Sequence, residues 1–191
     1  IAVFIGVIGN SLATFSKRIA SDIGFYSFES HFTSYSVKNY LWDQSIVQLI
    51  LNSLIFLAVL VVAVLGFHFP VTTSLLVQFF LLSLMGIYFS VIGFVLGVRV
   101  DAKTIDTIGF PVIILAAMTI ILFDTLGASG GFMDLVGKLQ RVFPGYYYTK
   151  LIQDLTEKQT IDATQLALFV AVFGLNLLFF YLLVPKGKMG N

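Results

Sequence analysis

Cysteine is absent from this chain of 191 residues, so it can form no disulfide, thiolate zinc site, iron–sulfur cluster or cysteine nucleophile. Charge is also scarce, because 11% of the residues are charged and 58% are hydrophobic, whereas about a quarter of a soluble domain is charged. The 11 basic and 10 acidic residues nearly cancel, which leaves no basic surface for nucleic acid. A chain of this size cannot cover so much apolar surface in water, so the sequence predicts a protein dissolved in lipid.

Sequence motifs of common enzyme sites are missing as well. The two histidines, His31 and His68, fall on opposite sides of the membrane in the topology expected below, and neither has carboxylates at ligand spacing. There is no Gly-x-Ser-x-Gly nucleophile elbow. The nearest approach to a Walker loop, at Gly137–Lys138, lacks its first glycine and its hydroxyl residue. We therefore expect no catalytic residue, no metal site and no cofactor in this chain.

Five apolar stretches divide the chain into expected membrane helices. A helix rises about 1.5 Å per residue, and the hydrocarbon core is about 30 Å thick. The first stretch covers only about 22 Å on this scale, so we interpret it as the second part of a spanning helix whose start is missing. We expect helices over about residues 1–15, 46–67, 73–98, 107–127 and 163–184. The predicted fold class is all-α, a polytopic membrane protein with one transmembrane domain over residues 1–191.

Lysine and arginine are distributed unequally between the two sides of the membrane. The connections on one side carry Lys17, Arg18, Lys38, Arg99, Lys103, Lys186 and Lys188. The connections on the other side carry Lys138, Arg141, Lys150 and Lys158. The positive-inside rule makes the richer side cytoplasmic. We therefore expect a multi-pass protein of the cell membrane, of the bacterial plasma-membrane type, with a cytoplasmic C-terminus and with residues 124–162 outside.

The connection before residue 46 carries a regular aromatic pattern. Phe25, Phe28, Phe32 and Tyr35 recur at steps of three, four and three residues, which places them on one helical face. Serine, threonine and glutamate occupy most of the remaining positions. We expect an amphipathic cytoplasmic helix over about residues 22–41. It either lies passively among the lipid headgroups or docks its aromatic face against another protein.

Small and uncharged polar residues enter the central apolar stretches. The polar ones either hydrogen-bond between helices or line a solute path, and they are Gln48, Asn52 and Gln78. The small ones follow one another at steps of four, three and four residues, and they are Gly86, Ser90, Gly93 and Gly97. This spacing forms a ridge of small residues on one helix face, which we call the glycine ridge. Another helix can approach such a ridge closely.

The external stretch predicts a hairpin that does not cross the membrane. Apolar residues recur at helical spacing over 132–142, Pro144 and Gly145 interrupt the pattern, and a second short helix can follow from Tyr146. Eleven residues give about 16 Å of helix, roughly half of a crossing. We expect a re-entrant hairpin over about residues 131–156, anchored at the membrane interface by Tyr146 and the tyrosines after it.

Together these features resemble the membrane subunit of the ABC type-2 permease family, an exporter class. Asp22-Ile23-Gly24 matches the acidic residue that this family often places two positions before a glycine. Ser34-Tyr35-Ser36 lacks the proline that commonly follows, and Phe143-Pro144 stands where Asn-Pro is usual. The resemblance implies a six-helix transmembrane domain whose N-terminal part is missing here. It also implies a coupling helix after the second span and a re-entrant hairpin before the sixth.

The resemblance also implies partners. A dimer of a separate ATP-binding subunit, which would hold ATP and magnesium, is expected to dock on Asp22, Gly24, Phe25, Phe28, Glu29, Phe32 and Tyr35. A second permease, identical or homologous, would complete a path lined by Gln48, Asn52 and Gln78, while the glycine ridge packs within one chain. The apolar interior favours an amphipathic, lipid-like, peptide or drug-like substrate. The other interpretations are a secondary carrier or channel, and an accessory membrane protein without transport activity.

Overall fold

The computed structural model describes residues 2–32, 36–68, 70–72, 74–109, 111, 114, 137, 138, 140–158 and 160–184. Within this part there is no strand, and the named helices are α1 (Ala2–Gly9), the π-helix η1 (Asn10–Thr14), α2 (Phe15–Phe32), α3 (Val37–Phe67), α4 (Ser74–Arg99), α7 (Pro144–Glu157) and α8 (Ala163–Leu183). Of these, α3, α4 and α8 are each long and apolar enough to cross a membrane. The all-helical structure and these three helices indicate an α-helical membrane protein, as the composition predicts.

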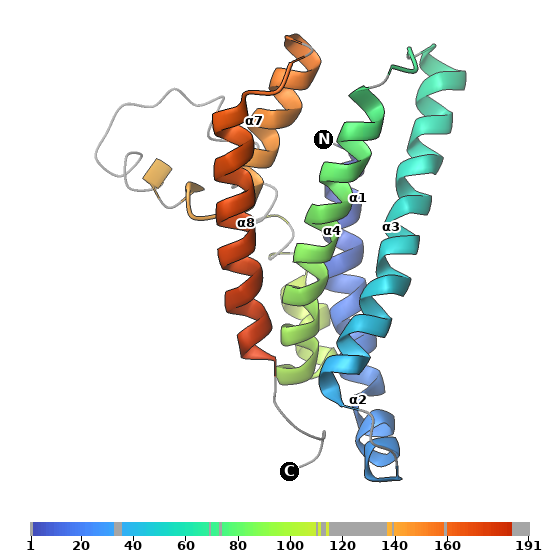
Figure 1. Cartoon of the computed structure of the whole chain (residues 1–191). Coiled ribbons are helices and arrows are strands. Elements are labelled where there is room, and N and C mark those ends of the chain that lie inside the picture. The colour runs from blue at the N-terminus through green and yellow to red at the C-terminus, as the bar shows by residue number, and fades with distance from the viewer. Residues whose placement is uncertain are drawn as a thin grey trace.

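Helix α4 is the centre of the bundle (Figure 1). In its most apolar stretch 61% of the residues are buried inside the protein, compared with 6% in α3 and 6% in α8. Leucine and valine side chains on α3 and α8 therefore face outward, where lipid rather than water would cover them. The three long helices run side by side, with α1 and η1 packed behind α4.

The helix expected over residues 1–15 does not end at Phe15. It continues through η1 into α2 and reaches Phe32. The separate helix expected over residues 22–41 is therefore wrong as a single element, because α2 ends at Phe32 and α3 begins at Val37. Ser36 has an extended backbone (φ −93°, ψ 156°), and its side chain accepts a hydrogen bond from the Asn39 backbone N–H at 3.2 Å. This N-cap starts α3 nine residues before the apolar stretch that predicted it.

The other expected helices agree with the structure in part. Helices α4 and α8 match the stretches 73–98 and 163–184 to within one residue at each end. Residues 102–109 are also helical, so the helix expected over 107–127 begins earlier, and most of that range lies outside the described residues. Asp101 caps its start by accepting from the Thr104 hydroxyl at 2.6 Å and from the Thr104 N–H at 2.9 Å. These hydrogen bonds, the hydroxyl first, lower the pKa of Asp101.

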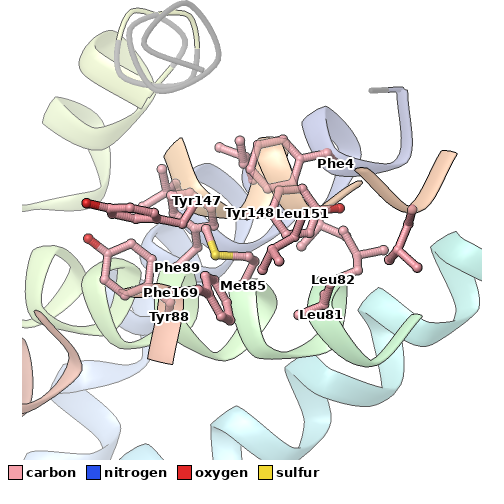
Figure 2. Packing of buried hydrophobic residues seen from close by; sticks show 14 residues of the cluster. Phe4, Leu81, Leu82, Met85, Tyr88, Phe89, Tyr147, Tyr148, Leu151 and Phe169 are labelled. Carbon is pink, nitrogen blue, oxygen red and sulfur yellow. The ribbon is translucent and has the colours of Figure 1, made fainter. Parts of the chain in front are cut away.

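Two clusters of buried side chains hold the bundle together. Figure 2 shows the first, in which Phe4 of α1, Met85 of α4 and Leu151 of α7 pack together with aromatic residues of α4, α7 and α8. The second joins α2, α3 and α4 around Phe15, Tyr40 and Phe94. The ring centroids of Tyr40 and Phe94 lie 5.7 Å apart. Both clusters include side chains of α4, which explains its central position.

One end of the bundle gathers the basic residues, and we call it the basic end. Arg99 at the end of α4 donates to the Leu183 carbonyl of α8 at 3.0 Å. The ammonium of Lys38, in the first turn of α3, lies 4.3 Å from the centre of the Tyr181 ring. Lys17 of α2 pairs with Asp106 at 2.8 Å, with both side chains about half exposed. The described basic residues that we expect to be cytoplasmic thus lie at one end, whereas the α3–α4 and α7–α8 connections lie at the other (Figure 1).

Candidate functional site

The glycine ridge of α4 packs against η1 and the start of α2. A methyl group built on Gly97 would lie 2.5 Å from the Ser16 carbonyl oxygen and 2.7 Å from the Ile19 Cβ. On Gly93 it would overlap the Ser11 carbonyl oxygen. Between Gly86 and Gly93 on the ridge, the Ser90 hydroxyl donates back to the Gly86 carbonyl at 2.7 Å. The close helix packing within one chain that the small residues predict is therefore present.

A polar junction lies where this ridge, η1 and α3 meet, and we define it by Asn10, Ser11 and Asn52. The Asn52 side-chain oxygen accepts from the Asn10 amide at 3.0 Å, and the Asn52 amide donates to the Ser11 hydroxyl at 3.1 Å. Asn52 is 4% exposed and Ser11 is fully buried. Gly86 makes room for this, since a methyl group there would lie 2.7 Å from the Asn52 amide nitrogen.

The junction corrects the expectation that Asn52 lines a path. Both polar atoms of its side chain are used inside the chain, so the asparagine joins α3 to η1. Gln48, one turn away, is 1% exposed and also points inward. Gln78 is half-buried and lies eight residues, about 12 Å of helix, from Gly86. The three residues expected to share one path are therefore not brought together.

Sequence reasoning missed Asn10 and Ser11. Both interrupt the first apolar stretch, and a polar residue inside such a stretch normally needs a protein partner. That signal was available in the sequence, but the identity of the partner was not, because Asn52 is 42 residues from Asn10. The junction also coincides with the π-helix η1, where the Phe15 N–H bonds to the Asn10 carbonyl. Single π-turns of this kind occur frequently at functional sites.

The aromatic face on α2 is exposed over its described part. Phe25, Phe28 and Phe32 are 65%, 66% and 77% exposed. The opposite side of α2 is fixed to α3, because the Tyr26 and Tyr40 ring centroids lie 3.6 Å apart. The three phenylalanines therefore point away from the bundle at its basic end, as one face of a helix that is anchored through its other face.

The remaining residues expected at this face are only partly described. Asp22 is half-buried, and Gly24 is exposed with open space around it. Glu29 is helical, but its side chain lies outside the description, and Tyr35 lies outside the described residues altogether. The candidate docking surface that the structure describes is therefore made of Phe25, Phe28 and Phe32, and we call it the aromatic face below.

Helix α7 begins in the middle of the bundle. Pro144 and Gly145 are buried and form its first turn, Tyr146 is half-buried, and the preceding carbonyl of Val142 accepts from the Asn176 amide at 2.8 Å. Asn176 lies thirteen residues, about 20 Å of helix, from the start of α8. The chain at Val142 is thus as deep as the inner part of a spanning helix.

From this depth α7 rises beside α8 to the opposite end from the basic residues (Figure 1). It is held there by Tyr148, whose ring stacks on Phe4 with centroids 4.6 Å apart. Its 14 residues cover about 21 Å, which is less than a crossing. A short helix that starts inside the bundle and ends at the surface is what the expected re-entrant hairpin requires of its second half. Of the first half, only residues 137, 138 and 140–142 are described.

The hairpin predicts which side of the membrane its lysines face. In this cysteine-free chain, a single cysteine replacing Lys138 or Lys158 is expected to react with an impermeant thiol reagent from the same side. A cysteine replacing the exposed Lys103, at the basic end, is the control and should react only from the other side. If Lys138→Cys reacts only from the side that labels Lys103→Cys, the chain crosses the membrane between residues 138 and 158.

The described residues show no group of three histidine, aspartate or glutamate side chains that could hold a metal ion. Of the two histidines, His68 is the C-cap of α3 with a left-handed backbone (φ 51°), a position that ends a helix. Comparison with family models, with curated proteins and with solved structures gives no match for this chain. The candidate site is therefore defined by its geometry: an exposed aromatic face and a π-helix lie on one continuous helical segment, and the polar junction joins that segment to α3.

Proposed function

We propose that this chain is the permease subunit of an ATP-driven ABC exporter, powered by a separate ATP-binding subunit. The observation that carries the proposal is the aromatic face, three exposed phenylalanines on an anchored helix at the basic end. A surface of this kind in water is unfavourable unless lipid or another protein covers it. Large aromatic side chains, phenylalanine included, also dominate the energetics of protein interfaces.

The same helical segment offers a route from that surface into the membrane. Helix α2 continues without a break through η1 into α1, and the glycine ridge locks η1 and α2 against α4. A displacement of the aromatic face would therefore move the segment and α4 together, with the π-turn at Asn10–Thr14 as the place where the helix can adjust. ATP-driven closure of the partner would bias the permease between two conformations through this contact.

The re-entrant geometry of α7 supports the same assignment. A half-helix that starts at membrane depth is tolerated only where protein or a cavity surrounds its start. Pro144 and Gly145 meet this condition, since both are buried against the bundle. We propose that two permease chains, identical or homologous, enclose the path and that the solute is amphipathic, lipid-like, peptide-like or drug-like. The apolar character of the described helices supports this solute class.

The double variant Phe28→Ala with Phe32→Ala tests the assignment. Truncation of two central aromatic residues is expected to weaken binding of the ATP-binding subunit by about tenfold or more. Membrane insertion should be unchanged, because both side chains are exposed and leave no cavity. The measurement is the amount of the ATP-binding subunit that co-purifies per chain, together with ATP-dependent transport in vesicles.

A matched control separates docking from loss of exposed aromatic surface in general. Phe67, at the other end of α3, is 79% exposed and lies far from the basic end along that helix. Phe67→Ala should leave both co-purification and transport at the wild-type level. If the double variant also retains the partner and transports normally, the aromatic face lies passively among headgroups and the docking proposal is wrong.

A further inference from the structure

A groove runs between α3, α4 and α8 near the basic end. Its volume is about 260 Å³, and its walls are mainly apolar side chains such as Val91 and Leu177. Gly174 widens it, because a methyl group built there would meet no atom within 4 Å. Trp42, which lines the groove, is 55% exposed. The groove therefore opens onto the outer, lipid-facing surface of the helices.

The groove also holds one polar group without a visible role. The Ser45 hydroxyl lines it and is 7% exposed, and among the described residues it has no hydrogen-bond partner. A buried hydroxyl without a partner carries an energetic cost that a bound acceptor would relieve. An occupant of this groove should therefore be an apolar chain that carries an oxygen acceptor near one end.

Two cations lie at the end of the groove that faces the basic end. Tyr181 lines the groove, and the Lys38 ammonium lies 4.3 Å from the centre of its ring. Arg99 donates to the carbonyl of Leu183, two residues further along α8. An occupant that is apolar along its length and negative at this end would match both the walls and the charges.

We propose that this groove binds an anionic phospholipid of the membrane leaflet at the basic end. One acyl chain lies along Val91 and Leu177, and the phosphate lies near Lys38 and Arg99. Ser45 lies seven residues, about 10 Å of helix, deeper than Lys38. At that depth its hydroxyl can donate to an ester carbonyl of the lipid. This site is on the outer surface of the bundle and is independent of the proposed transport role.

Trp42 provides a direct test, because it is the only tryptophan in the chain. The full chain is reconstituted in mixed vesicles of phosphatidylcholine and phosphatidylglycerol, with bromine on the acyl chains of one lipid at a time. Bromine quenches tryptophan fluorescence on contact. At equal mole fraction, brominated phosphatidylglycerol is expected to quench Trp42 several-fold more, since each nearby cation enriches anionic lipid by about fivefold.

Matched variants separate the groove from the general surface. Gly174→Leu places a side chain in the groove at a position where an added Cβ meets no atom within 4 Å, and it should reduce quenching by the anionic lipid to the level of the zwitterionic one. Gly66→Leu adds the same side chain at another exposed helical glycine and should change nothing. Lys38→Gln and Arg99→Gln should each reduce the excess of quenching by the anionic lipid over the zwitterionic lipid by up to about fivefold. Lys103 is an exposed cation at the same end, and Lys103→Gln should leave this excess unchanged.

Three results would overturn the proposal. Equal quenching by the two lipids in the wild type would mean that ordinary annular lipid occupies the groove. Absence of quenching by either lipid would mean that protein, such as a second copy of this chain, covers it. An effect of Lys103→Gln as large as that of Lys38→Gln would assign the preference to diffuse surface charge. None of these results depends on whether an ATP-binding subunit is bound.

Discussion

Leucine in place of Gly93 is expected to leave little folded protein in the membrane. A single methyl group at this position already overlaps the Ser11 carbonyl oxygen, which is backbone in η1 and cannot swing aside as a side chain can. Even Gly93→Ala should cost about 3 kcal/mol, the upper end of the usual overpacking cost. Leucine would force α4 away from η1 and so separate the two elements that the glycine ridge joins.

Thermal unfolding of the detergent-purified protein measures this effect. Gly66→Leu is the matched control, because it adds the same side chain to another helical glycine with open space around it. The control should unfold at the wild-type temperature, whereas Gly93→Ala should unfold well below it and Gly93→Leu should yield little protein to measure. Equal yields and unfolding temperatures for all three would show that α4 and η1 do not approach as closely as described.

The second large effect is expected from Asn52→Leu, and the structure reverses the sequence-based expectation. As a path-lining residue, Asn52 should tolerate leucine with little effect on assembly. Its two hydrogen bonds to Asn10 and Ser11 show instead that it joins helices within the chain. Losing both should cost about 1–3 kcal/mol, and the larger side chain also meets the α4 backbone at Gly86. We therefore expect loss of folded protein before any specific change in transport.

A double-mutant cycle isolates the hydrogen bond from the change of volume. Asn10→Ala and Asn52→Ala, alone and combined, should show a coupling energy of about 0.6–1.7 kcal/mol. The control is Ser53→Ala, one residue along α3, whose hydroxyl bonds to the Leu49 carbonyl of its own helix. The path interpretation would be restored by two results together: a coupling energy of zero between Asn10 and Asn52, and loss of transport in Asn52→Leu.

The positions of the apolar helices could be predicted from the sequence to a useful degree, and the reason is physical. Long uncharged stretches have one stable solution in lipid, so α4 and α8 begin and end within one residue of the expected limits. The start of α3 could not be predicted in the same way. Residues 37–45 are polar enough to escape a hydropathy criterion, yet they stay helical because Ser36 caps them and Tyr40 is buried against Phe94.

The candidate site could likewise be predicted from the sequence only in part. Periodicity places Phe25, Phe28 and Phe32 on one face, and their similar exposure is what a shared face requires. The spacing of small residues likewise identifies Gly93 and Gly97 as contacts. Which helix they contact depends on the tertiary fold, as does the choice between path and structural bond for Asn52. Both are long-range pairings that no local pattern in one sequence encodes.

The proposed function depends most directly on docking of an ATP-binding subunit to the aromatic face of α2. The direct measurement is the composition of the complex purified gently from native membranes through a tag on this chain. We expect an ATP-binding subunit in a one-to-one ratio with the chain, and its loss in Phe28→Ala with Phe32→Ala but not in Phe67→Ala. A chain that purifies without any ATP-binding protein, while retaining its folded state and its transport or other activity, would contradict the assignment.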